Sequence, residues 1–239
     1  MVHVALLRLQ RLFLPPTCLL CAGMGQDLDF DICAACSADL PAHGHACVRC
    51  GEFLTNKNSA IDICGACLKR PPRYDAIHCA FSYGYPIDHL IRALKYHGRL
   101  AHGRVLGRLL AHSLQASSPS WPEWIVPVPL ASSRYSERGF NQAFEIAKQL
   151  QHVLRIPIHT DVLERIRDTR EQAGLDRIGR RKNVRGAFKL RDSVPGLHVA
   201  IVDDVVTTGS TVNEVARVLK RAGARRVDVW AVARASKSF

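Results

Sequence analysis

One stretch near the C-terminus constrains the fold more than any other part of the chain. It begins with the apolar run Val199 to Val202, continues with the acids Asp203 and Asp204, and ends in the turn Val205-Val206-Thr207-Thr208-Gly209-Ser210-Thr211. An apolar run without polar alternation is typical of a strand that is buried on both faces of a parallel sheet. Ligands of such sheets bind at the carboxyl ends of the strands, so the acids and the turn are predicted to form a binding site.

The residue types of this turn suit a ribose phosphate. Gly209 allows close backbone approach, and the amides that open the following helix can bind a phosphate dianion together with four hydroxyl groups. The hydroxyl residues are Thr207, Thr208, Ser210 and Thr211. Asp203 and Asp204 repel phosphate, so they suit ribose hydroxyls with Mg²⁺ nearby. The alternative is a buried strand and a capped helix with two solvated acids.

Eight of the nine cysteines form four C-x-x-C pairs: Cys18 with Cys21, Cys33 with Cys36, Cys47 with Cys50, and Cys64 with Cys67. Two such pairs can place four thiolates around one tetrahedral zinc ion, and all-thiolate zinc sites are structural. The chain is therefore predicted to hold two structural Zn²⁺ ions. Pairing of sequence neighbours is the simplest assignment, and interleaved pairing stays open. The ninth cysteine, Cys79, lies in an apolar strand pattern and is expected in the core.

The charge of the chain is unevenly distributed. The formal net charge is +12, yet the first 67 residues contain four Lys/Arg and six Asp/Glu, so the excess lies in the remainder. A basic body favours anionic partners such as a pyrophosphate, a nucleotide or a nucleic-acid backbone. No apolar run is long enough to span a membrane, and Arg8 and Arg11 interrupt the apolar N-terminal segment, so we expect a cytoplasmic protein without disulfides.

The sequence changes character at Pro71-Pro72, where we place a domain boundary. Residues 1–70 are predicted to form an N-terminal helix and a double zinc ribbon, and residues 71–239 an α/β domain. Strand patterns at 76–83, 124–129, 156–164, 197–203 and 227–233 alternate there with helical patterns at 87–95, 101–114, 141–154 and 211–222. This alternation predicts a mostly parallel sheet with helices on both faces.

Two further segments suit the same site. Ser132, Ser133 and Arg134 follow a predicted strand and offer hydroxyls and a guanidinium group to a pyrophosphate. A simple turn from strand to helix is the alternative. The polar segment 169–183 is a candidate lid that closes over the site and excludes water, and a solvated helix is the alternative there.

The stretch 199–211 resembles the 5-phosphoribosyl 1-pyrophosphate (PRPP) signature of type I phosphoribosyltransferases. The chain as a whole resembles the ComF/GntX family, in which a cysteine-rich zinc domain precedes a phosphoribosyltransferase-like domain. The resemblance is carried by the C-x-x-C pairs, Leu94-Lys95-Tyr96-x-Gly98, Pro127-Val128-Pro129, Arg138-Gly139-Phe140-Asn141-Gln142, Gln172 with Leu175, Arg180-x-x-Asn183, Gly186-Ala187-Phe188 and the PRPP signature.

This resemblance implies PRPP and Mg²⁺ as ligands, with Lys95 as a further ligand of the pyrophosphate and with Gln172, Arg180 and Asn183 in the lid. If the protein is an enzyme, it implies transfer of ribosyl 5-phosphate to an acceptor, with Asp203 and Asp204 as catalytic residues that hold the ribose. A regulator that senses PRPP without turnover is the alternative. The cellular roles implied are DNA uptake in natural transformation, with contacts to single-stranded DNA or the uptake machinery, or gluconate utilisation. The acceptor and the oligomeric state stay open.

Overall fold

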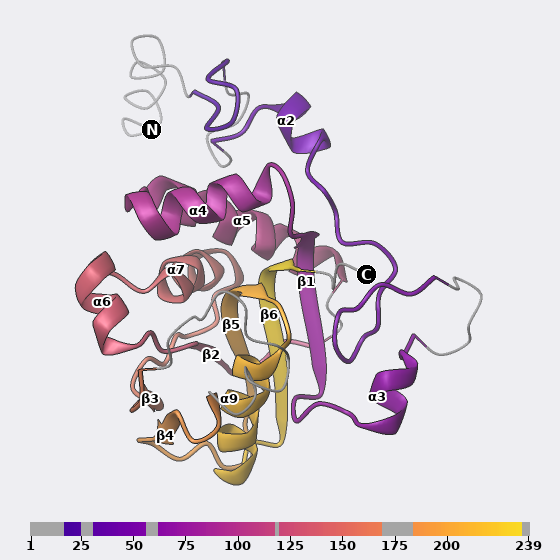
Figure 1. Ribbon diagram of the computed structural model, residues 1–239, viewed down its shortest axis with the longest axis vertical. Helices are drawn as coiled ribbons and strands as arrows, with labels where there is room; N and C mark the ends of the chain where they lie inside the picture. Colours follow the sequence, from indigo (N-terminus) through magenta and orange to yellow (C-terminus); the bar gives the residue numbers. More distant parts are fainter. Residues whose placement is uncertain (1–16, 25–30, 56–61, 118–119, 169–183, 236–239) are drawn as a thin grey trace.

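The computed structural model describes residues 17–24, 31–55, 62–117, 120–168 and 184–235. Its centre is a parallel four-stranded sheet in the order β1-β6-β5-β2 (Figure 1). These strands are β1 (Ala76–Ser82), β2 (Trp124–Pro127), β5 (His198–Val206) and β6 (Arg226–Arg234). A separate antiparallel pair joins β3 (Leu163–Arg165) to β4 (Phe188–Leu190). The predicted α/β fold with a mostly parallel sheet is confirmed.

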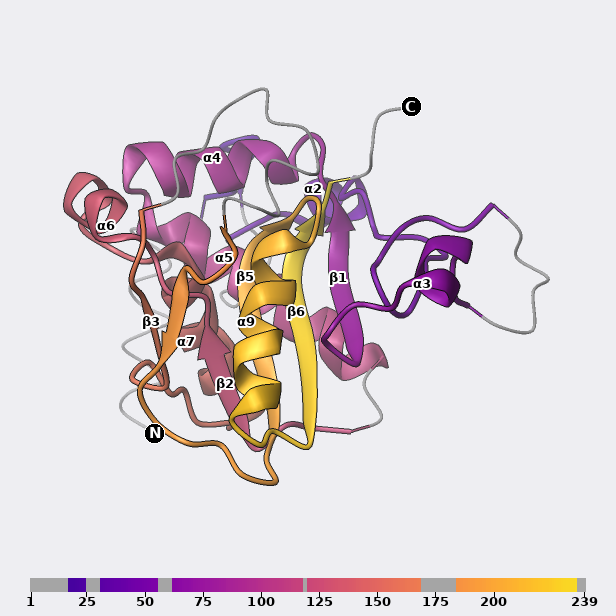
Figure 2. The ribbon, with the colours of Figure 1, turned by 60° about the horizontal axis from the view of Figure 1, so that its bottom comes forward.

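Helices cover both faces of the sheet (Figures 1 and 2). One face carries α4 (Ile87–His97), α5 (Leu100–Ser117) and α7 (Gln142–Leu154), and the other carries α9 (Ser210–Arg221). On β5, Ala200 and Val202 pack into the core with the three helices, whereas Val199 and Ile201 pack into the core with α9. Successive side chains of a strand point to opposite faces, so this run needs apolar residues at every position.

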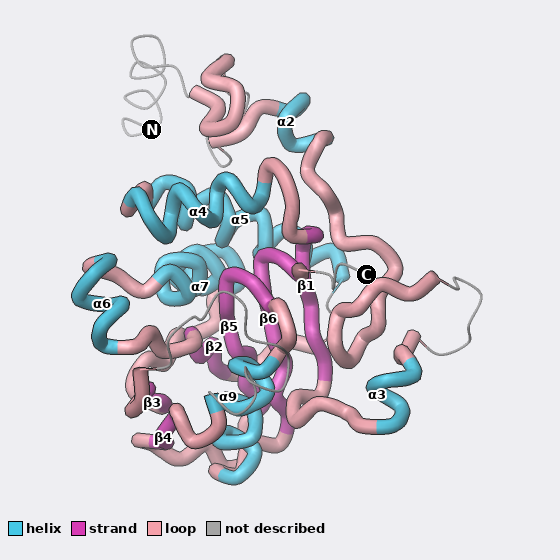
Figure 3. The backbone as a smooth tube through the Cα atoms, in the orientation of Figure 1, coloured by secondary structure: helices cyan, strands magenta, loops and turns pink. Residues whose placement is uncertain are grey.

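The cysteine-rich part is mostly loop and includes the short helices α2 (Ala34–Ala38) and α3 (Gly65–Lys69) (Figure 3). Its second half lies along the edge strand β1 (Figure 2). The backbone amide of Ile77 donates to the Val48 carbonyl at 3.1 Å, and Arg49 Nη1 donates to the Asp75 carbonyl at 2.8 Å. The predicted domain boundary at residue 70 stays a prediction. Among the described residues, no helix combines the length and apolar character that crossing a membrane requires.

The structure differs from the predicted elements in three places. The strand predicted at 156–164 is wrong: Ile158 makes a single bridge to Ile125, and the next regular strand begins at Leu163. Pro157 lacks an amide hydrogen and cannot extend a ladder on both sides. The central strand continues to Val206, three residues beyond the predicted end, so both acids belong to the strand. A short helix, α6 (Ser132–Arg138), replaces the loop expected after β2.

Candidate functional site

Asp204 lies almost fully buried near the carboxyl end of β5, with 2% of its surface exposed. Its carboxylate forms an ion pair with Lys95 near the end of α4 and accepts a hydrogen bond from Gln142 Nε2 at 3.2 Å. These partners place Asp204 on the face of the sheet covered by α4 and α7. Lys95, which was predicted to assist with pyrophosphate, therefore neutralises Asp204 in this structure.

Asp203 occupies a different environment from its neighbour. It is half-buried, and its Oδ1 accepts the backbone amide of Asp204 at 2.9 Å. Because side chains alternate along a strand, Asp203 points toward the face covered by α9. Burial, followed by the negative charge of Asp204, raises the pKa of Asp203 to about 8, although the charge of Lys95 acts in the opposite direction. The side chains of the two adjacent acids thus lie on opposite faces of the sheet.

The segment Arg138 to Gln142 joins the surrounding elements. The Asn141 side chain caps the first turn of α7 and also donates to the Val128 carbonyl, just after β2, at 3.0 Å. Arg138 Nη1 donates to Gln142 Oε1 at 3.1 Å, and its guanidinium group lies 5.6 Å from the centre of the Tyr96 ring. The family resemblance includes this segment but assigns it no role. Its role in the structure is to hold the ends of α4, β2 and α7 beside Asp204.

The hydroxyl-rich turn from Val205 to Thr211 includes the first two residues of α9. Gly209 precedes that helix with φ +73°, a left-handed conformation that favours glycine. Thr208 Oγ1 and Ser210 Oγ lie 2.8 Å apart, and the Ser210 amide donates to Thr208 Oγ1 at 3.3 Å. The first turn of α9 contains no acidic residue. Hydroxyls, amides and the positive end of a 12-residue helix therefore meet at one place, as a phosphate site requires.

The predicted pyrophosphate residues lie in the first turn of α6, where Ser132 and Ser133 are exposed and Arg134 is half-buried. Since β2 and β5 are parallel neighbours, their carboxyl ends meet at the same edge of the sheet, and α6 follows β2 at that edge. Gln172, Arg180 and Asn183 lie outside the described residues.

The eight paired cysteines form two groups of four: Cys18, Cys21, Cys33 and Cys36, then Cys47, Cys50, Cys64 and Cys67. Within each group, all sulfur atoms lie within 4.8 Å of one another. The Sγ atoms of Cys21 and Cys33 are 3.7 Å apart, and those of Cys50 and Cys64 are 3.6 Å apart. A tetrahedron with Zn–S bonds of 2.3 Å has edges of about 3.8 Å. The groups therefore fit zinc, and pairing of sequence neighbours is confirmed.

Arg234, the last residue of β6, was missed by the sequence reasoning. It is 4% exposed and donates to the backbone carbonyls of Val206 and Thr207, at the start of the hydroxyl-rich turn. The available signal was its position at the end of the apolar run from Val229 to Ala233, because a charged residue inside a buried strand requires partners.

Two family models match the chain: the double zinc ribbon domain over residues 9–68 and the phosphoribosyl transferase domain over residues 138–238. The chain is 34% identical over 225 residues to Competence protein F of Haemophilus influenzae, covering 91% of this chain and 96% of that protein. It is 35% identical over 227 residues to DNA utilization protein YhgH of Escherichia coli K12, covering 93% and 99%. It is 26% identical over 156 residues to Competence protein ComFC of Streptococcus pneumoniae, covering 64% and 66%. The chain therefore belongs to the ComF/GntX family, with a double zinc ribbon ahead of its phosphoribosyltransferase domain.

Proposed function

We propose that this protein binds PRPP with Mg²⁺ at the carboxyl end of β5 and acts in the cytoplasm on DNA taken up during natural transformation. The observation that carries the PRPP proposal is the junction of β5 and α9. There the carboxylate of Asp203 precedes a turn whose hydroxyls gather at a helix N-terminus. The candidate ligand for the ribose hydroxyls, Asp203, is thus followed directly in the chain by the candidate binding site for the 5-phosphate.

Each part of the ligand has a candidate partner. The 5-phosphate binds the turn from Val205 to Thr211, and the ribose hydroxyls bind Asp203, whose carboxylate is also a suitable oxygen ligand for Mg²⁺. Ser132, Ser133 and Arg134 bind the pyrophosphate. Asp204, held by Lys95 and Gln142, keeps the end of β5 in place. Lys95 is a further candidate ligand of the pyrophosphate, and to bind it Lys95 has to leave its ion pair with Asp204.

A PRPP site of this kind is compatible with two alternative modes of action. As an enzyme, it transfers ribosyl 5-phosphate from PRPP to an acceptor while pyrophosphate leaves, and its residues contribute by positioning and by stabilising charge. As a regulator, it binds PRPP without product. Release of pyrophosphate in the presence of an acceptor distinguishes the enzyme from the regulator.

Calorimetric titration with PRPP and Mg²⁺ tests the proposal. The wild-type protein is expected to bind, and Asp203→Asn is expected to bind at least about tenfold more weakly, because an amide cannot lose a proton to become a charged oxygen ligand when Mg²⁺ binds. Asp192→Asn is the matched control, since Asp192 is an exposed acid in the loop before β5. Absence of binding by the wild type overturns the proposal. Equal affinities of all three proteins exclude Asp203 from the site.

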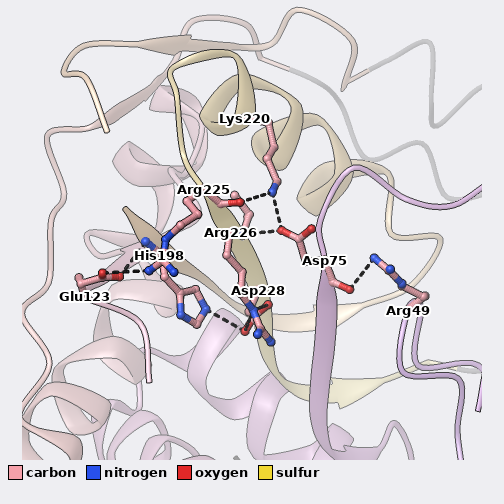
Figure 4. A network of polar contacts seen from close by, with 9 residues as sticks. Arg49, Asp75, Glu123, His198, Lys220, Arg225, Arg226 and Asp228 are labelled. Carbon is pink, nitrogen blue, oxygen red and sulfur yellow. Dashed lines mark hydrogen bonds and ion pairs between the residues drawn. The ribbon is translucent and has the colours of Figure 1, made fainter. Parts of the chain in front are cut away.

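The DNA role is supported by the names of the relatives and by basic residues near the end of the sheet where β5 and β6 begin. Figure 4 shows four of them, Arg49, Lys220, Arg225 and Arg226, beside the acids Asp75 and Asp228. One hollow of about 360 Å³ is lined by Arg49, Asp75, Arg225 and Arg226. Another, of about 220 Å³, is lined by Arg73, Arg217, Lys220 and Arg221. Lys220 Nζ and Asp75 Oδ2 lie 2.6 Å apart, so the two hollows adjoin. We call the seven Lys and Arg residues of these hollows the basic surface.

Acidic neighbours hold part of this surface in place. Arg226 Nε lies 3.0 Å from Asp228 Oδ1, and His198 Nε2 lies 2.9 Å from Asp228 Oδ2. Although burial acts in the opposite direction, these hydrogen bonds lower the pKa of Asp228 and keep it charged. Within the described part of the chain, the seven cations outnumber the four acids that pair with them, which are Asp75, Glu123, Glu214 and Asp228. An extended set of cations suits the repeated phosphates of single-stranded DNA. Since β5 runs from this surface to the PRPP site, the two lie roughly 26 Å apart.

Binding of a fluorescent single-stranded oligonucleotide at several salt concentrations tests this role. The double variant Arg73→Glu/Arg221→Glu is expected to weaken binding and to flatten its salt dependence, while PRPP affinity stays unchanged. Arg92→Glu, at an exposed arginine of α4, is the control. If both variants bind DNA like the wild type, the basic surface is not the DNA site.

A further inference from the structure

A single buried side chain connects the second cysteine group to the turn proposed to hold phosphate. Arg234 Nε donates to the Cys50 carbonyl at 2.9 Å, and its Nη2 lies 3.0 Å from Glu52 Oε2. On the other side, Nη1 donates to the carbonyls of Val206, at 3.0 Å, and of Thr207. One planar guanidinium group thus bonds to the backbone of a predicted zinc ligand and to the first residues of the turn.

Packing around Arg234 fixes its position. Gly51, between Cys50 and Glu52, has φ +69°, and a Cβ atom built there would lie 3.3 Å from Arg234 Cδ. The ribbon backbone therefore wraps closely over the arginine stem. Arg234 also donates to the Ala235 carbonyl at 2.6 Å, so the Nη1 group is shared among three carbonyl oxygens. A buried guanidinium requires this many acceptors, and their loss would leave a charge without compensation.

A second contact joins the same two regions. Tyr74, which follows the second cysteine group in the chain, is 3% exposed. Its hydroxyl lies 3.6 Å from the position that a Cβ atom of Gly209 would occupy. The second cysteine group and the segment after it thus approach the turn both at its first residues and at the residue before α9.

From these contacts we infer that Arg234 is a positioning residue that couples the zinc site of Cys47, Cys50, Cys64 and Cys67 to the PRPP turn. A zinc ion at this site would fix the Cys50 backbone, and with it the position of the Arg234 guanidinium group. Arg234 in turn holds the Val206 and Thr207 carbonyls, so that the turn keeps the conformation that binds phosphate. The inference rests on the proposed PRPP function. Coupling between two binding sites is reciprocal, so PRPP must raise the zinc affinity of this site by the same factor by which zinc raises the PRPP affinity.

Zinc release to a colorimetric chelator tests the coupling with the full-length protein. At equilibrium with the chelator, PRPP with Mg²⁺ is expected to raise the affinity of the protein for one of the two zinc ions by about fivefold or more, which is a typical coupling strength. The affinity for the other ion, at Cys18, Cys21, Cys33 and Cys36, is expected to stay unchanged. Cys21→Ser, which weakens that first site, identifies the protected ion as the one in the second site.

Arg234→Lys keeps the charge but cannot bridge the same acceptors. It is expected to remove the PRPP effect on zinc release and to weaken PRPP binding by about tenfold. A purely structural role for Arg234 would instead change zinc release equally with and without PRPP. If Arg234→Lys does not fold, Glu52→Gln provides the test, because it weakens the ribbon side of the link alone.

The outcomes separate this inference from the proposed function. If the wild type does not bind PRPP by calorimetry, the proposed function fails and the inference fails with it. If the wild type binds PRPP but its affinity for both zinc ions, measured at equilibrium with the chelator, is unchanged, PRPP binding stands and the coupling through Arg234 is wrong.

Discussion

Lys95 and Asp204 form an ion pair between the end of α4 and the end of β5, and the carboxylate side chain is only 3% exposed. Removal of one partner from a buried pair leaves an uncompensated charge, which typically costs 3–5 kcal/mol. This pair therefore helps to hold α4 against the edge of the sheet that carries the candidate site.

Lys95→Met is expected to lower the free energy of unfolding by about 3 kcal/mol, because Asp204 keeps only the hydrogen bond from Gln142. Urea denaturation measures this change. The double variant Lys95→Met/Asp204→Asn should recover part of the loss. Arg92→Met breaks the pair of α4 with Asp88, in which the arginine is 59% exposed, and should cost less than about 1 kcal/mol. Equal effects of the two single variants would contradict this prediction.

Gly209→Ala is expected to destabilise the protein by about 1 kcal/mol and to weaken PRPP binding, because φ +73° is unfavourable for a residue with a Cβ atom. Thermal unfolding and calorimetric titration give the two readouts. Gly65→Ala on α3 is the control, since no atom lies within 4 Å of a Cβ built there. If Gly209→Ala binds PRPP with wild-type affinity, the left-handed turn is not needed for the ligand.

The free energy of unfolding is expected to fall as the pH decreases from about 6.5 to 4, because His78 resists protonation in the folded protein. Its ring bonds to Ser113 Oγ at 2.9 Å and Ser117 Oγ at 3.1 Å. Burial, and then the charge of His43, lower the pKa of His78 to about 4. The unfolded chain takes up a proton near pH 6.5, before the folded protein does. The contribution of neutral His78 is therefore complete above that pH and is lost toward pH 4.

The loss should amount to about 2–3 kcal/mol. Urea denaturation of the wild type and of His78→Gln across this range measures it, because the variant has no titrating group at this position. The difference in unfolding free energy between the two proteins should shrink as the pH falls. Parallel pH profiles would show that His78 does not titrate differently in the folded state.

Metal analysis of the purified protein is expected to find two zinc ions per chain, one for each cysteine group. Cys47→Ser should leave one ion, because three thiolates do not complete a tetrahedral site. Cys79→Ser should retain both, since Cys79 lies buried in β1 outside either group. Chelation should unfold the cysteine-rich part. Retention of two ions by Cys47→Ser would refute the assignment.

Local sequence patterns predicted much of this molecule. The C-x-x-C spacing predicted two zinc sites, because two cysteines of such a pair can bind one ion, but it left open which pairs share an ion. The uninterrupted apolar run before Asp203 specified a strand with helices on both faces. The small residue Gly209 marked the turn, since few other residues adopt its conformation.

Only the tertiary structure decided which residues share the site. Asp203 and Asp204 are equivalent in the sequence, but the alternation of β5 sends Asp204 to Lys95 and Gln142 and leaves Asp203 half-buried on the other face. The hydrogen bond from Arg234 to Cys50, through which Cys50 is linked to Val206, joins residues that are 184 positions apart in the chain. Local patterns carry the information for single turns and ligand pairs. Contacts between distant segments depend on how the sheet and the ribbon pack together, because that packing alone determines which buried charges meet.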